Sequence, residues 1–572
     1  MSNKTKNGHG VQEEIHNKNP AEKSWLAYIL IHYRWVFVCF FLLPLSLVYD
    51  IYHLARSWVI FKLNSAPKKH DERVKFVQQQ VREWNQQGRS TPMCTARPGW
   101  QTISFRQPKY KKTLFNVKVN LMDVLEIDTE KKTVRVEPLV SMGQLSATLN
   151  PLGWTIPILP EMDDLTVGGL IMGTGIETSS HKHGLFQHIC VSYELVMADG
   201  SAVKCSKEEN SDLYYAIPWS YGTLGFLTAV EIEIIPALQF VRLEYQSVSS
   251  LDEACRVFQE QTLKDENNQF VEGLMFSLNR GVIMTANMVN SAEPGKLNVI
   301  SRWYKPWFFK HVESFWGQEP HVEYIPTRDY FHRHSRSIFW EIQDIIPFGN
   351  HPVFRYLFGW MVPPKVSLLK LTQGETVKEL YENNHFIQDM LVPMTTLKDA
   401  LLCFEKEVKI YPVWLCPFKL PMAPGMLRSP SGKQEMYVDI GTYGVPIVNN
   451  FHPVETTRRV ESFVRSVNGF HKLPMAPGML RSPSGKQEMY VDIGTYGVPK
   501  VNNFHPVETT RRVESFVRSV NGFQMLYADS YMTEAEFHSM FDHTLYNQMR
   551  KKYDCDKAFP RVYGKVSRAA RD

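Results

Sequence analysis

TVGGLIMGTGIET, residues Thr166–Thr178, is the stretch that decides the fold of this 572-residue chain. Its four glycines leave a backbone without side chains, so several N–H groups can face an anion such as a diphosphate. Threonine hydroxyls in and around the stretch add further donors. The spacing is neither the GxGxxG of a Rossmann site nor the GxxxxGK[ST] of a P-loop. Taken alone, the stretch is as compatible with a structural turn as with a phosphate site.

Ordered motifs flank this loop on both sides. Upstream lie RPGW at Arg97–Trp100 and the segment Asn120–Pro160, which ends in NPLGWTIPILP. Downstream lies PWSYGTLGFLTAVEIEIIP at Pro218–Pro236. Four motifs in a fixed order are much more specific than one glycine-rich loop.

The flanking segments predict a mixture of strands and helices. Period-two alternation predicts strands over Thr133–Pro138 and Phe226–Pro236, and Asp199-Gly200 predicts a two-residue hairpin turn within LVMADGSAVKC. Apolar residues at helical spacing predict helices over Lys69–Gln87 and Gly143–Leu149. The mixture indicates an α+β domain.

The order of the motifs resembles the FAD-binding domain of the vanillyl-alcohol oxidase and p-cresol methylhydroxylase (PCMH) type, over about Phe61–Leu238. A longer resemblance, from about residue 28 to the C-terminus, is to the Δ24-sterol reductase family. The segments that carry it are RWVFVCFFLLPLSL, CTARPGW, VRVEPLVSMGQ, DDLTVGGLIMGTGIE, GLFQHIC, RSIFWEIQDIIPFGN, FRYLFGWMVPPK, LLKLTQGET, QDMLVP and QMLYADSYM. It implies an α+β fold with a two-subdomain PCMH-type FAD-binding domain, an α+β cap or substrate domain, and an N-terminal transmembrane helix.

The resemblance also implies an activity. An enzyme of the endoplasmic-reticulum membrane would use FAD and NADPH to reduce the Δ24 side-chain double bond of a sterol, as in desmosterol to cholesterol. NADPH would reduce FAD, the reduced flavin would deliver hydride to one alkene carbon, and a general acid would protonate the other. Because an isolated alkene accepts hydride poorly, the acid must act early and the site must exclude water.

The resemblance places the FAD on the glycine-rich loop, and Arg97, Gly99, Gly143, Gly222 and Gly225 are weaker candidates. The RPGW turn has no histidine or cysteine for a covalent link, so we expect non-covalent FAD. The expected contacts are the residues of the loop: Thr166, Val167, Gly168, Gly169, Leu170, Ile171, Met172, Gly173, Thr174, Gly175, Ile176, Glu177 and Thr178.

Three histidines follow the loop closely, at positions 181, 183 and 188. They lack a carboxylate partner set, so we expect no metal site. Contact with the cofactor or with solvent is the preferred interpretation of all three.

No single residue stands out as the proton donor. The candidates are tyrosines and a lysine in the C-terminal half of the chain, each of which a structural role would explain as well: Tyr527, Tyr531, Lys370, and Tyr443 or Tyr496. FHRHSR, residues Phe331–Arg336, is a candidate for the NADPH phosphates, although a solvated charged loop is the simpler interpretation.

Composition and the N-terminus indicate a membrane-attached globular protein. Apolar residues make up 44% and charged residues 22%, and a formal charge of +5 without a basic stripe gives no support for a nucleic-acid partner. Residues 1–24 are polar and are expected to be disordered. Residues 25–52 are apolar with aromatic ends, which predicts a single-pass anchor in the lipid bilayer. Eight scattered cysteines without metal-ligand spacing indicate a reduced, cytosolic catalytic body.

Two domains follow the anchor: an FAD-binding domain over 61–237 and a substrate or cap domain over 238–572. Two aromatic-dense tracts, Tyr304–Trp316 and Phe354–Pro364, suggest that the second domain lines an apolar site.

The second domain contains a tandem duplication, because 419–470 reappears as 472–523 with one difference, Ile447 against Lys500. The strand YVDIGTYG therefore occurs twice, at Tyr437–Gly444 and Tyr490–Gly497, although a sheet has one place for it. We expect the surplus copy to be extruded from the sheet.

Three alternatives stay open from the sequence. The chain could be a PCMH-type flavin oxidase or dehydrogenase of another small or lipid substrate. It could be an inactive sterol-binding homologue that has lost its flavin. The duplication could be a gene-model artefact, or it could be real and leave the chain inactive.

Overall fold

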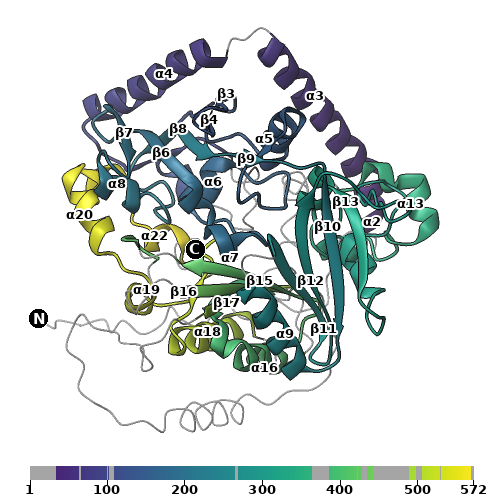
Figure 1. The fold of residues 1–572 in the computed structure, drawn as a ribbon. Coiled ribbons are helices and arrows are strands. Elements are labelled where there is room, and N and C mark those ends of the chain that lie inside the picture. Colours follow the sequence, from purple (N-terminus) through teal and green to yellow (C-terminus); the bar gives the residue numbers. More distant parts are fainter. Residues whose placement is uncertain are drawn as a thin grey trace, which may run out of the picture.

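The computed structural model describes residues 34–62, 66–98, 101, 109–264, 268–363, 386–420, 423–427, 435–442, 489–497, 501, 505–528 and 530–568. Two β-sheets dominate it, with helices on their outer faces (Figure 1). Short elements accompany them: β1 (Met93–Thr95) and β2 (Phe115–Val117), which pair in parallel, β5 (Trp154–Thr155) and β9 (Ile235–Pro236), which pair antiparallel, α10 (Phe308–Glu313), α11 (Thr327–Phe331) and α12 (Glu341–Ile345).

The first sheet is antiparallel, with strand order β3-β4-β8-β6-β7. Its strands are β3 (Val124–Asp128), β4 (Thr133–Val136), β6 (Cys190–Val196), β7 (Ala202–Ser206) and β8 (Phe226–Glu233). The predicted strands are confirmed, but the β6–β7 turn is longer than predicted. Residues 197–201 form it, closed by a hydrogen bond from the Met197 N–H to the Ser201 carbonyl at 2.9 Å. Gly200 adopts a left-handed φ of +83° there.

Helices α4 (Ala66–Gln86), α5 (Met142–Leu149), α6 (Val167–Met172) and α8 (Ser211–Ala216) accompany this sheet, and α4 and α5 are the two that the spacing predicts. The short helix α7 (Ser180–His183) instead contacts the second sheet. The Ser141 hydroxyl caps α5 by accepting from the Gln144 N–H at 3.1 Å. Val77, Val81 and Trp84 form the buried face of α4.

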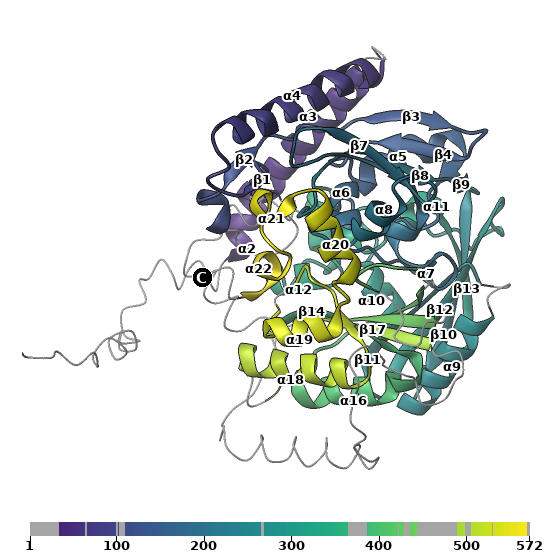
Figure 2. The same ribbon diagram turned by 90° about the vertical axis from the view of Figure 1, so that its left-hand side faces the viewer.

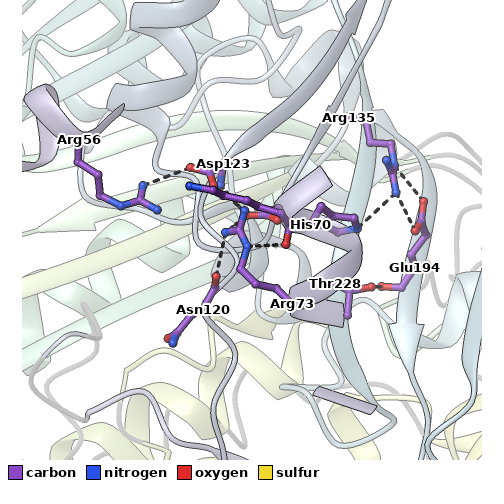
Figure 3. Close-up of polar contacts among 10 residues, drawn as sticks. Arg56, His70, Arg73, Asn120, Asp123, Arg135, Glu194 and Thr228 are labelled. Atoms are coloured by element: carbon purple, nitrogen blue, oxygen red, sulfur yellow. Dashed lines mark hydrogen bonds and ion pairs between the residues drawn. The ribbon is translucent and has the colours of Figure 1, made fainter. Parts of the chain in front are cut away.

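The N-terminal apolar segment forms α2 (Arg34–Phe37), a short π-helical segment (Val38–Leu42) and α3 (Leu43–Lys62). Within it, Trp35–His53 is long and apolar enough to cross a membrane. A polar cluster joins α3 and α4 to the first sheet, as Figure 3 shows. Arg56 on α3 and Arg73 on α4 both pair with Asp123, at 3.2 and 2.7 Å.

The second sheet has nine strands in the order β13-β10-β12-β11-β15-β16-β17-β14-β18. Helices α9 (Leu251–Leu263), α16 (Leu397–Glu407) and α18 (Pro506–Ser519) lie against it (Figures 1 and 2). The strands are β10 (Phe240–Val248), β11 (Phe270–Ser277), β12 (Arg280–Val289), β13 (His321–Pro326), β14 (Phe386–Pro393), β15 (Val413–Leu420), β16 (Glu435–Thr442), β17 (Met489–Gly497) and β18 (Phe523–Gln524).

The duplicated strand appears twice in this sheet, as β16 and β17, so the expectation that one copy lies outside the sheet is wrong. The two copies nevertheless share partners. Val438 and Val491, which are equivalent in the duplication, both pair with Pro417 on β15 and with Val392 on β14. Both copies therefore pair with the same residues of β14 and β15, so they share one place in the sheet.

The C-terminal segment returns to the first sheet, which the expected second domain of 238–572 does not anticipate. After α19 (Glu534–Met540) come helices α20 (Thr544–Lys552), α21 (Cys555–Ala558) and α22 (Tyr563–Val566), and α20 packs against α8 (Figure 2). The hydroxyl groups of Tyr546 and Thr223 lie 2.7 Å apart, and Arg550 donates to the Thr223 carbonyl at 2.9 Å. The tail thus forms part of the wall beside the glycine-rich loop.

Candidate functional site

The glycine-rich loop begins with an extended Thr166 and continues into the short helix α6. Two of its N–H groups bind within the protein: Val167 donates to the Val140 carbonyl at 2.9 Å and Gly168 to the Pro138 carbonyl at 2.8 Å. These two amides are therefore not available to a ligand. The expectation that the whole loop offers bare backbone is too broad.

Three of the four glycines are required by packing. A Cβ on Gly168 would lie 2.8 Å from the Pro138 side chain, and one on Gly175 would lie 2.8 Å from Leu170. A Cβ on Gly173 would lie 3.0 Å from the Gly169 carbonyl. Gly169 differs, because it is exposed and its nearest neighbour would be the Thr166 hydroxyl at 3.2 Å.

Unpartnered polar groups mark the part of the loop that fits a diphosphate. Among the described residues, the N–H groups of Gly169, Thr174, Gly175 and Ile176 have no backbone acceptor. The Thr174 Oγ1 is buried, and it too finds no partner in the described part of the chain. Buried donors of this kind are normally satisfied. An anion with several oxygens, such as the diphosphate of FAD, supplies the missing acceptors.

Three cations lie beside this loop. Arg97 donates to the Thr166 hydroxyl at 3.3 Å, and Lys111 donates to the Arg97 carbonyl at 2.5 Å. Lys565, from the returning C-terminal segment, donates to the Tyr221 carbonyl. The Tyr221 N–H in turn donates to the Met172 carbonyl of the loop at 2.9 Å.

The charges of these cations are poorly compensated. Burial, and to a smaller extent the neighbouring charge of Lys111, lowers the pKa of Lys565 from its usual 10.5 to about 8. Burial is also the main cause of the lowered pKa values of Lys111 and Arg97, although Asp164 partly offsets the effect at Arg97. None of the three forms an ion pair with a described carboxylate. A site with three cations and a single acidic neighbour, Asp164, fits an anionic ligand.

The end of the loop is tied to the second sheet by a buried ionic network. Arg333 lies 3.2 Å from Glu177 and 2.9 Å from Glu272, and all three side chains are almost fully buried. Trp414 on β15 donates to Glu272 at 2.9 Å. The network fixes the loop against the sheet.

The network corrects both interpretations of FHRHSR, Phe331–Arg336. Arg333 is buried and paired, and Arg336 donates to the backbone carbonyls of Ile300, Arg302, Trp303 and Lys305. Burial lowers the pKa of His334 to about 4. The segment is therefore not a solvated charged loop, and the guanidinium groups of Arg333 and Arg336 already have acceptors within the protein.

The histidines and the weaker glycine candidates have structural partners. The ring nitrogens of His181 contact the carbonyls of Thr178 and Asn268, each at 3.0 Å, and His188 accepts from the Leu185 N–H at 2.8 Å. His183 is exposed. No cluster of three potential metal ligands occurs among the residues that the structure describes.

A Cβ on Gly143 would meet Asp163, and one on Gly225 would meet the Val196 carbonyl, so packing explains both glycines. Gly222 has a φ of +68° and lies beside the Lys565 ammonium. Gly99 lies outside the described residues.

Of the candidate proton donors, Tyr527 has the most informative environment. Tyr527 is half-buried, and its hydroxyl donates to Asp389 on β14. Asp389 is buried, and burial raises its pKa well above the usual range. Tyr531 contributes its backbone, accepting from Arg511 and donating to Glu514. Lys370 and Tyr443 lie outside the described residues, as does the side chain of Tyr496.

A cavity of about 550 Å³ lies elsewhere, lined by residues of 299–303, 326–336 and 359–362. Its lining includes no residue of the glycine-rich loop, so it is not the diphosphate site. All eight cysteines are free thiols.

Comparison with known proteins supports the cofactor and identifies the family. An FAD-binding-domain family model matches residues 76–206, which include the glycine-rich loop. The human Delta(24)-sterol reductase is 55% identical over 96% of both chains. A Delta(24)-sterol reductase homolog of Caenorhabditis elegans is 44% identical over 95% of this chain and 96% of its own length, and the Delta(24)-sterol reductase of Pisum sativum is 37% identical over 96% and 93%.

A shorter match distinguishes the shared domain from the rest. The mouse L-gulonolactone oxidase is 30% identical over 50% of this chain and 58% of its own length. The human, Caenorhabditis elegans and Pisum sativum relatives, by contrast, match over at least 93% of their own length. The chain carries an FAD-binding domain and belongs to the Δ24-sterol reductase family.

Proposed function

We propose that the protein is an FAD-dependent reductase of the Δ24 side-chain double bond of sterols, with NADPH as electron donor and desmosterol to cholesterol as the type reaction. The observation that carries the proposal is the 55% identity to a Delta(24)-sterol reductase over 96% of the chain. The cation-lined glycine loop, with its unpartnered donors, supports FAD as the cofactor.

We assign residues 166–178 to FAD binding, with unequal roles. Gly169 and Thr174 would face the diphosphate, because they carry the accessible or unpartnered donors. Gly168, Gly173 and Gly175 would shape the loop through close packing. Arg97, Lys111 and Lys565 would neutralise the phosphate charge. We expect the FAD to be held without a covalent bond.

FAD, when bound, supplies the hydride chemistry; the chain supplies orientation, a proton and a dry site. The pair Tyr527–Asp389 is our candidate for the proton. Burial raises the pKa of Asp389 well above its usual range, which favours its protonated form, and Tyr527 is the half-buried member of the pair. The buried acid Glu161 is a less suitable donor because it is enclosed.

We further propose an endoplasmic-reticulum location with the catalytic body in the cytosol. The apolar segment within residues 25–52 would provide attachment to the bilayer. Residues 61–237 would bind FAD, and 238–572 would form the cap apart from the returning C-terminal helices. The free thiols support the cytosolic side.

The experiment is reduction of desmosterol by NADPH in microsomes that express the chain. Gly169→Glu is expected to abolish activity and bound flavin, because it places a carboxylate where the diphosphate would lie. Gly169→Ala is the matched control and is expected to retain both, since its Cβ meets only the Thr166 hydroxyl. Full activity of Gly169→Glu would refute the cofactor assignment.

A further inference from the structure

Both ends of the apolar N-terminal helix touch the same catalytic body. The Trp35 ring packs edge-on against Phe348, with centroids 5.0 Å apart, and Arg56 pairs with Asp123 at 3.2 Å. About 20 helical residues separate these contacts, roughly 30 Å at 1.5 Å per residue. That is about the thickness of the hydrocarbon core of a bilayer. A helix that crossed the membrane between them would put the two contacts on opposite sides.

The helix has a protein-facing side along its first half. Val38, Leu42 and Leu43 are at most 1% exposed, and they belong to the continuous core of the protein. A spanning helix would expose these residues to lipid and leave an apolar gap in the core. The opposite side of the helix is also apolar and is exposed; its members are Phe37, Phe40, Phe41, Leu45, Val48, Ile51, Tyr52, Trp58 and Val59.

A second exposed apolar stripe lies on α13 (Pro352–Phe358) and the 3₁₀ turn that follows it, Gly359–Met361. The spacing i, i+3, i+4, i+7 is that of one helix face, and it normally faces a core. Here it faces outward: the stripe consists of Val353, Tyr356, Leu357 and Trp360, which are 59%, 64%, 60% and 53% exposed. The inward side of the helix is occupied by Phe354 and by Arg355, which donates to the Asn350 carbonyl.

The two stripes are neighbours. The 3₁₀ turn Gly359–Met361 contacts α3, and Trp35 packs on Phe348 just before α13. Figure 1 shows α13 beside α2 at one edge of the molecule. We propose that α2–α3 lies in the plane of the membrane surface instead of crossing the bilayer, and that the α13 stripe enters the same leaflet beside it. This proposal is an alternative to the single-pass anchor expected from the sequence, and it does not depend on the sterol reductase activity.

The chemistry of the two stripes favours lipid over a second protein. Exposed apolar side chains run along the helix from Phe37 to Val59, over roughly 33 Å, and continue on a separate segment of the chain. Aromatic residues are prominent on both stripes, as on helices that lie at the boundary between head groups and acyl chains. A monomeric soluble protein rarely exposes apolar area of this extent.

Topology is tested with the chain's own sequon, Asn3-Lys4-Thr5. In sealed microsomes we expect Asn3 to stay unglycosylated and epitope tags at both termini to be digested by added protease, because both termini lie on the same side. Asn3→Gln is the matched control for any mobility shift. A glycosylated Asn3 together with a digested C-terminal tag would overturn the in-plane arrangement.

Lipid contact is tested separately with a photoreactive benzophenone amino acid in the full-length chain in microsomes. Placed at Tyr356 or at Tyr52, it is expected to cross-link to lipid. Placed at Leu263 or Leu152, which are similarly exposed but lie on other helical segments, it is expected not to. Cross-linking to a second copy of the chain from Tyr356, or no lipid adduct there, would overturn the α13 contact.

Discussion

Lys565 offers the sharpest test of the cofactor site. Its charge should destabilise the folded apoprotein and at the same time strengthen FAD binding. Its folded pKa of about 8 lies below the usual 10.5. At 1.36 kcal/mol per pKa unit, a charged Lys565 destabilises the apoprotein by up to about 3 kcal/mol at neutral pH. The side chain is only half-buried, so solvent screening reduces the expected value to about 1–2 kcal/mol.

Lys565→Met should therefore raise the thermal midpoint of the apoprotein and weaken FAD binding. Loss of one charge-assisted contact corresponds to about 1.5–3 kcal/mol, or an approximately 10–100-fold higher Kd. The exposed Lys112→Met is the control and should change neither quantity. The measurements are thermal unfolding of apoprotein and fluorescence titration with FAD.

The pH dependence has a defined sign. Between pH 8 and 10.5 the unfolded chain binds more protons at Lys565 than the folded chain, so the wild-type apoprotein gains stability relative to Lys565→Met as the pH rises. FAD affinity of the wild type should be flat below pH 8 and weaken above it, because the free ammonium deprotonates. A destabilised Lys565→Met apoprotein with unchanged FAD affinity would refute the reasoning.

Three further predictions concern other parts of the chain. Tyr527→Phe should lower the rate of sterol reduction about 100-fold or more while flavin content stays unchanged, as single-turnover kinetics would reveal; an unaltered rate would exclude Tyr527 as the proton donor. Arg333→Met should destabilise the fold by about 3–5 kcal/mol, because it leaves Glu177 and Glu272 buried without their cation, and thermal unfolding checks this. Deletion of residues 420–472, which leaves one copy of the duplicated segment, should raise the thermal midpoint, since the sheet has one place for the strand; a lower midpoint would show that both copies contribute.

Local patterns predicted much of the fold. The spacing of apolar residues gave α4, α5, β4 and β8, because each pattern is set by neighbours in the chain. The β6–β7 turn is longer than the Asp199-Gly200 pair predicts, since these two residues form only the tip of a five-residue connection. The glycine-rich loop was recognised, but packing, and not ligand approach, explains most of its glycines.

The part of the candidate site that local sequence patterns do not predict is formed by residues far apart in the chain. Lys565 lies near the loop only because the C-terminal helices return to the first sheet, and nothing in the local sequence around it signals this. The pair Tyr527–Asp389 likewise joins a C-terminal turn to strand β14. Arg333 is charged, so composition alone predicts that it lies in an exposed loop. It is buried instead, because two buried glutamates from separate elements, Glu177 and Glu272, pair with it. Such contacts are set by tertiary structure.

The central claim, that the bound flavin passes electrons from NADPH to a sterol alkene, is tested most directly by anaerobic spectrophotometry of the purified protein. NADPH should bleach the flavin absorbance, and desmosterol added afterwards should restore it with formation of cholesterol. Bleaching by an alcohol or a lactone instead, with peroxide formed when air is admitted, would contradict the account and indicate an oxidase.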